Sequence, residues 1–282
     1  MSHLSTPPPP EIAITTDLKS ACSALMQSDK SGAIWYRDPS KWDDVTEYLN
    51  ACRVHASDNR WRTVDSERQV ITTEADINRL RGNLSRTGQY FGLKELECFA
   101  NARQKLLSDL TFINVLAQQL APKAYASNPT YLVGSEVPRF HFHAQSLHLL
   151  VNYTEGGCRI AGEQSLEISP DGKAKLRPDE KSFVVPPFSV LFMKGNKNFD
   201  CSSESFHSAS NFGLFHASPP AAPLPGTVTN RFSLVVRMKE VQFLTLPNET
   251  LMSSMFAEAM SECITASAAE RIKASLWMAN CL

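Results

Sequence analysis

The sequence predicts an α+β protein in which a mainly helical first half packs on a core of short β-strands. Apolar residues recur at helical spacing up to about residue 127. Beyond that point, short segments rich in β-branched and aromatic residues are separated by Gly, Pro, Asn and Asp. Because roughly eight or nine such strands follow one another without helices between them, they favour a double-stranded β-helix, the jelly-roll or cupin-like architecture.

We expect four regions along the chain. Residues 1–15 form a disordered Pro-rich lead, because Pro7 to Pro10 favour extended chain and no apolar signal-peptide segment accompanies them. Residues 16–127 are mainly helical. Residues 128–245 form the jelly-roll core, in which we expect a metal site, and residues 246–282 form C-terminal helices.

Cap signals and apolar spacing locate the helices of the first half. They are expected over residues 17–27, 39–52, 73–85 and 92–120, with a short strand over 33–36. The last helix is expected to be interrupted near Ser108 and Asp109. The helices of residues 92–120 and of the C-terminal region could pack on the barrel or form a homodimer interface.

The strands of the core are predicted from alternating and apolar runs bounded by turn residues. A hairpin turn is predicted at Ser169-Pro-Asp-Gly172. The expected strands cover residues 131–133, 139–143, 147–153, 158–161, 166–168, 182–185, 189–194, 213–216 and 231–238.

Composition excludes several classes of function. The 282 residues have a formal net charge of −1, so nothing indicates binding to nucleic acid or to an anionic membrane. No apolar run approaches the length of a membrane span. The seven cysteines are scattered and never spaced as CxxC, which argues against a disulfide framework or a thiolate zinc site. We therefore expect a protein of the reducing cytoplasm.

Histidines give the clearest indication of function. On a strand, side chains alternate between faces, so His141 and His143 point one way while Phe140 and Phe142 point the other. Together with His216 further along, this pair predicts a metal site. The alternative is a pair of strand histidines satisfied by hydrogen bonds.

The three-histidine set departs from the usual non-haem iron site. That site uses two His and one carboxylate and leaves positions open for dioxygen or substrate, with the close pair being His-x-Asp. Since His143 stands in the place of the Asp, all three ligands would be neutral. We expect Fe(II), with copper or zinc as alternatives.

Three further residues are candidates for binding or catalysis. His148 follows a predicted turn, and we expect it to line the pocket, where it would orient a ligand or take part in catalysis. Arg231 and Ser233 lie on one face of a late strand, where an Arg could clamp the far carboxylate of 2-oxoglutarate with help from the hydroxyl. The alternative for Arg231 is a strand-end Arg paired with a surface acid.

Several motifs resemble an uncharacterised domain-of-unknown-function family. They are Arg139-Phe-His141-x-His143, His148-Leu-Leu-x-x-Tyr153-x-x-Gly-Gly157, Val190-Leu-Phe-Met-Lys-Gly195 and His216-x-Ser-Pro219. The family pattern runs FHxD, RLLxTYxGPGT, an LLKGE-like strand and HRSP, and the resemblance covers roughly residues 30–240. The family is similar in outline to iron/2-oxoglutarate oxygenases, which implies a barrel and a metal but no substrate. His143 replaces its Asp, and His148 replaces its Arg.

The sequence therefore predicts a metal-dependent enzyme, an oxygenase or oxidative tailoring enzyme that acts on a small molecule with dioxygen. Apolar walls are expected from residues such as Phe140, Phe142, Leu149, Phe192 and Phe215, and the sequence leaves open which of them face inward. Two alternatives stay open. One is a non-redox cyclase, isomerase or hydrolase that uses the metal as a Lewis acid, and the other is a non-catalytic cupin-like protein that binds a metal or ligand.

Overall fold

A computed structural model describes most of the chain up to Met238. The described residues are 6–53, 75, 78–79, 81–82, 93, 95–120, 125–133, 139–143, 147–154, 157–169, 173–195, 213–218 and 230–238. The C-terminal helices predicted over 246–282 and most of the helix predicted over 73–85 lie outside these residues.

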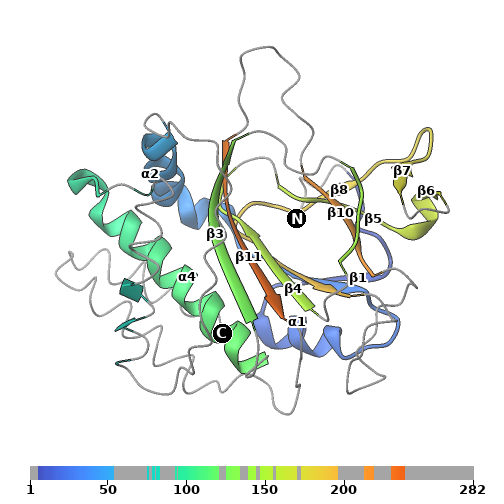
Figure 1. The fold of residues 1–282 in the computed structure, drawn as a ribbon, viewed down its shortest axis with the longest axis horizontal. Helices are drawn as coiled ribbons and strands as arrows, with labels where there is room; N and C mark the ends of the chain where they lie inside the picture. Colours follow the sequence, from blue (N-terminus) through green and yellow to red (C-terminus); the bar gives the residue numbers. More distant parts are fainter. Residues whose placement is uncertain are drawn as a thin grey trace.

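The largest β-sheet has six strands and forms the centre of the molecule (Figure 1). Strands β1 and β2 pair in parallel, and every other neighbouring pair is antiparallel. In spatial order the strands are β1 (Ile12–Thr15), β2 (Gly32–Trp35), β9 (Val190–Lys194), β4 (Leu147–Asn152), β11 (Asn230–Met238) and β3 (Tyr125–Val133).

A smaller sheet lies across from this one. It consists of β10 (Phe215–Ala217), β5 (Arg159–Ala161) and β8 (Phe183–Val184), and an isolated bridge joins His141 to His216 at its edge. A second bridge, from Phe140 to Ala174, connects the same segment to the hairpin of β6 (Leu166–Ile168) and β7 (Ala174–Leu176). The predicted turn at Ser169–Gly172 thus falls between two paired strands.

Among the described residues, the α-helices with assigned bounds are α1 (Leu18–Leu25), α2 (Asp43–Arg53) and α4 (Ala100–Leu120), and residues 75, 78–79 and 81–82 are helical as well. Short 3-10 turns cover Pro39–Trp42, Glu97–Phe99 and Glu163–Ser165. In Figure 1, α2 and α4 lie on one side of β3, β11 and β4, and the smaller sheet lies on the other. The α+β class is confirmed, while the double-stranded β-helix stays a prediction. Among the described residues, no helix has the length and apolar character needed to cross a membrane.

The two faces of the large sheet have different neighbours, and this division positions the functional residues. Leu149, Val151 and Leu234 face the helices and belong to the main hydrophobic core with α2 and α4. Leu150 packs on the opposite side, against a cluster that joins Leu191 of the large sheet to Ile160 of the small one. Residues that alternate in phase with Leu150 therefore lie between the two sheets.

The early part of the chain forms more β-strand than the regions expected from the sequence implied. Residues 12–15, assigned to a disordered lead, form β1, and residues 32–35 form β2 at the edge of the large sheet. The register places Ile34 beside Leu191, so both segments complete the same apolar layer. The lead is therefore not disordered at its end, because burial of Ile12 in this layer stabilises it.

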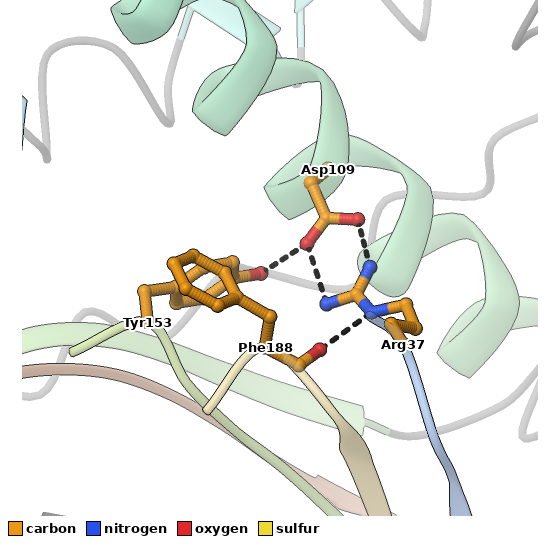
Figure 2. Close-up of polar contacts among 4 residues, drawn as sticks. All are labelled: Arg37, Asp109, Tyr153 and Phe188. Atoms are coloured by element: carbon orange, nitrogen blue, oxygen red, sulfur yellow. Dashed lines mark hydrogen bonds and ion pairs between the residues drawn. The ribbon is translucent and has the colours of Figure 1, made fainter. Parts of the chain in front are cut away.

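Helix α4 also differs from expectation, because it runs through Ser108 and Asp109 without a break. Asp109 is buried, with 1% of its surface exposed, and its carboxylate pairs with the guanidinium of Arg37 (Figure 2). Arg37 Nη2 lies 3.1 Å from Asp109 Oδ2, and the phenol of Tyr153 donates to the same oxygen at 2.6 Å. Because its oxygens already have these partners, the carboxylate does not compete for the backbone hydrogen bonds of the helix.

The same network reaches a fourth segment. Arg37 Nε donates to the carbonyl of Phe188, whose φ of 64° lies in the left-handed region. The guanidinium also sits 4.9 Å from the ring of Trp42 and 5.3 Å from that of Trp35, in cation–π geometry. Burial, followed by the charge of Asp109, raises the pKa of Tyr153 well above its usual value, so this phenol keeps the proton that it donates.

Replacing Asp109 by Ala should destabilise the fold strongly. Removal of one partner leaves the buried Arg37 uncompensated, at a cost of about 3–5 kcal/mol. Tyr153→Phe removes one hydrogen bond to a charged group and should cost less, about 1–3 kcal/mol. Both changes are measured by urea unfolding.

Control variants test whether the loss of stability comes from the unpaired buried charge. Arg37→Met combined with Asp109→Asn should be milder than Asp109→Ala, because no unpaired charge is left. Asp44→Ala, which breaks the more exposed pair with Lys105, should cost less than about 1 kcal/mol. Equal losses for Asp44→Ala and Asp109→Ala would contradict the assignment.

Candidate metal centre

The backbone itself brings two of the predicted ligands together. His141 and His216 exchange both of their backbone hydrogen bonds, each 2.9 Å long, across the edge of the small sheet. Directly opposed residues of an antiparallel pair project from the same face. Their ring centroids are accordingly 4.3 Å apart. Because His216 also pairs with Ile160, which packs in the layer between the sheets, both imidazoles face that layer.

His143 completes the group. Its ring centroid lies 5.1 Å from that of His141 and 4.7 Å from that of His216. One ring nitrogen from each of the three residues lies within 4.8 Å of the others. Nitrogens that share one ion at about 2.1 Å cannot be more than about 4.2 Å apart, so small rotations of the side chains would close the group around a metal.

The phenylalanines alternate as the sequence predicts. The Phe142 ring packs edge-on against Phe215 at 5.4 Å, and Phe140 belongs to the same outer cluster. Both therefore lie on the side of this chain segment opposite His141 and His143.

The predicted apolar walls are wrong as a consequence. Phe140, Phe142 and Phe215 pack in the outer cluster, and Leu149 and Phe192 pack beneath the helices. The apolar residues between the sheets come instead from the other face of β4 and β9 and from β2, β5 and β8. They include Ile34, Leu150, Ile160, Phe183, Leu191 and Met193.

Two of the three imidazoles are oriented by backbone carbonyls. Nδ1 of His141 lies 3.1 Å from the carbonyl oxygen of Arg139, and Nδ1 of His216 lies 3.1 Å from that of Leu214. Because a carbonyl oxygen only accepts, Nδ1 must hold the proton in both rings, and Nε2 keeps its lone pair. This is the arrangement by which metal-binding histidines are commonly held.

The cluster favours neutral imidazoles. Burial lowers the pKa of His141, opposed by the hydrogen bond to Arg139. Burial, followed by the charges of His148, His141 and Arg237, lowers the pKa of His143 to about 2. Since a metal ligand must be deprotonated, these residues present the form that a metal needs near neutral pH.

His148 lies on β4, beside the metal-binding group. Its ring stacks on that of His143 with centroids 4.1 Å apart and planes inclined by 17°. It alternates in phase with Leu150, so it faces the space between the sheets, and only 1% of its surface is exposed. Burial and the charge of His216 lower its pKa well below the usual value. The expectation that His148 lies beside the site is consistent with this geometry.

Sequence reasoning missed Arg237, which pairs in register with His148 across β4 and β11. Arg237 is half-buried, and its charge acts on both His143 and His148. Within the described part of the chain it makes no ion pair or hydrogen bond. Counting four residues on from Ser233 along the same face would have found it.

The carboxylate-binding pair predicted from sequence is only partly described. Ser233 is buried on β11, and its hydroxyl donates to Asn152 Oδ1 at 2.6 Å. The backbone of Arg231 pairs with Leu132, six residues before the level of His148, and its side chain lies outside the described part of the chain. Its predicted role therefore stays a prediction.

No family model and no curated protein matches the sequence, so the resemblance to the uncharacterised family stays a prediction. Among solved structures, a full-length Neurospora crassa protein in complex with alpha-KG and thymine aligns at 11% identity and a TM-score of 0.35, over 80% of both chains. A putative 2OG-Fe(II) oxygenase family protein from Caulobacter crescentus aligns at 9% identity and a TM-score of 0.31, over 82% of this chain and 87% of that one.

Substitution of His141 or His216, the two histidines oriented by backbone carbonyls, should abolish metal binding. His141→Ala or His216→Ala leaves two protein ligands, and affinity for Co(II) should fall by more than the about 10–100-fold loss typical of changes around a ligand. Titration followed by visible absorption measures this.

A substitution on the opposite face supplies the control. Phe142→Leu lies between two ligands along the chain but packs against Phe215, so it should retain metal. Full occupancy in His141→Ala or His216→Ala would refute the assignment of that residue as a ligand.

Proposed function

We propose that this chain is a non-haem, metal-dependent oxygenase that acts on a small anionic molecule. His141, His143 and His216 would hold Fe(II). The observation behind this proposal is the convergence of three imidazole nitrogens from two chain segments, two of them aimed by backbone carbonyls. An accidental cluster of buried histidines has no need of that shared orientation.

The donor set fits an open metal site. Fe(II) bound by three protein ligands retains open coordination positions and supplies dioxygen chemistry. The chain's own part is to keep the imidazoles of His141 and His143 neutral by burial and to exclude water with the apolar layer between the sheets. Half-buried Leu150 and Val235 flank this layer beside His148, and their exposed parts would contact a small substrate.

Charge balance favours an anionic ligand. Histidine binds a metal as the neutral imidazole, so three such ligands would leave a divalent metal uncompensated. Arg237, whose charge acts on His143 and His148, adds a further positive charge nearby. No carboxylate of the described residues pairs with that guanidinium. A carboxylate on the substrate or co-substrate would satisfy both the metal and Arg237.

We propose 2-oxoglutarate as the co-substrate that supplies this carboxylate. The register favours Arg237 over Arg231 as its anchor, because Arg237 is level with His148 whereas Arg231 lies six residues earlier on β11. At about 3.3 Å per residue, that difference is roughly 20 Å along the strand. Ser233 and Asn152 form a polar pair between the two levels and would contact the polar end of a bound molecule.

One observation favours a second candidate function. Three histidines without a carboxylate are also the ligand set of some catalytic zinc sites, in which the metal acts on water as a Lewis acid. In that case the chain would be a non-redox cyclase, isomerase or hydrolase. A non-catalytic protein that binds a metal or small ligand is the third candidate, and all three share the same centre.

Metal analysis separates these candidates. Protein purified without added metal should contain stoichiometric iron, and the Fe(II) form should consume dioxygen when supplied with 2-oxoglutarate. The chemical reason is that the neutral set leaves positions for both molecules. Stoichiometric zinc without dioxygen uptake would contradict the oxygenase and favour the second candidate.

The two arginines provide a matched pair of variants. Addition of 2-oxoglutarate to the anaerobic Fe(II) protein should produce a visible charge-transfer band. Arg237→Met should weaken binding by about 2–5 kcal/mol, because truncation leaves a carboxylate unpaired, whereas Arg231→Met should titrate like the wild type. The reverse pattern would assign the anchor to Arg231, and no band in the wild type would remove 2-oxoglutarate.

A further inference from the structure

The three candidate ligands are not held in the same way. His141 and His216 each have Nδ1 fixed by a backbone carbonyl two residues earlier along the chain. His143 has no hydrogen bond to a ring nitrogen within the described residues, and its contacts there are with other rings. Its orientation must therefore come from packing.

We propose that His148 is the positioning residue for His143. Its ring orients the His143 ring by stacking, as backbone carbonyls orient the rings of His141 and His216. This inference rests on the proposed metal centre. The two rings lie 4.1 Å apart at 17°, which is the closest and most nearly parallel contact in the histidine cluster. The ring nitrogens of an imidazole lie in its plane, so fixing the plane fixes the directions in which they can bind a metal.

His148 is suited to this task by its place in the fold. It lies on β4, between β9 and β11, and its backbone is paired with Met193 on one side and Arg237 on the other. His143, in contrast, lies two residues beyond the isolated bridge of His141 and belongs to no strand. A ring on a central strand thus supports a ring on a segment with fewer backbone constraints.

The geometry distinguishes support from ligation. The group of side chains whose nitrogens converge within 4.8 Å consists of His141, His143 and His216 among the described residues, without His148. His148 is therefore assigned the role of orienting the His143 ring, and not that of a metal ligand.

The test compares two replacements of similar bulk in the full-length protein. His148→Phe retains a flat ring that can stack but offers no nitrogen, whereas His148→Leu retains apolar volume without the plane. Co(II) titration, read by affinity and by the position and intensity of its visible bands, is the measurement. Residues that orient a ligand typically contribute about 10–100-fold to metal affinity.

We expect His148→Leu to lose about 10–100-fold in affinity and to alter the Co(II) bands, and His148→Phe to recover most of both. In a His143→Ala background, the two replacements should differ little, because the ring on which they act is gone. Phe142→Leu, next to His143 in the chain but packed on the opposite face against Phe215, is the control and should bind Co(II) like the wild type. Circular dichroism at the assay temperature confirms that each variant is folded.

Three results would overturn the inference. Wild-type affinity and bands in His148→Leu would show that stacking has no role. Loss in His148→Phe as complete as in His143→Ala would show that His148 acts through its nitrogens, as a ligand. A difference between the two replacements that persists in the His143→Ala background would show an effect independent of His143. A wild-type chain that binds no Co(II) would instead refute the proposed function itself.

Discussion

The buried carboxylate of Asp109 joins parts of the chain that are far apart in sequence. It binds Arg37, which follows β2, and accepts the phenolic proton of Tyr153, which follows β4. Through Arg37 the same network holds the Phe188 turn that precedes β9. Helix α4 and three strands of the large sheet are thereby fixed relative to one another, because no member of the network can move without exposing a buried charge.

This constraint extends to the metal-binding face. Strand β4 ends beside Tyr153 on the helix side and presents His148 on the other side, four residues before Asn152. Strand β9, which leads away from the Phe188 turn, places Met193 beside His148. The histidine cluster therefore stands against a sheet whose position is set from its opposite face. The candidate ligands on β10 and in the segment bridged to it thus face the large sheet.

The sequence predicted that His141 and His143 project together. The structure adds the isolated bridge that brings His216 to His141. The rings of His143 and His148 lie in contact, and no count of spacing along the chain reveals that contact.

What could not be predicted depends on partners distant in sequence. Asp109 looked like a helix interruption because its partner Arg37 is 72 residues away. The apolar walls were misassigned because alternation gives two faces of a strand but not which one meets the small sheet. Arg237 was overlooked because its importance comes from its register with His148, and that register is fixed by sheet pairing.

X-ray absorption spectroscopy of the metal-loaded protein tests the central claim most directly, since it counts imidazole ligands. Three imidazole nitrogens at about 2.0–2.2 Å are expected, falling to two in His216→Ala. Four imidazoles in the wild type would make His148 a ligand, and fewer than three would contradict the proposed centre.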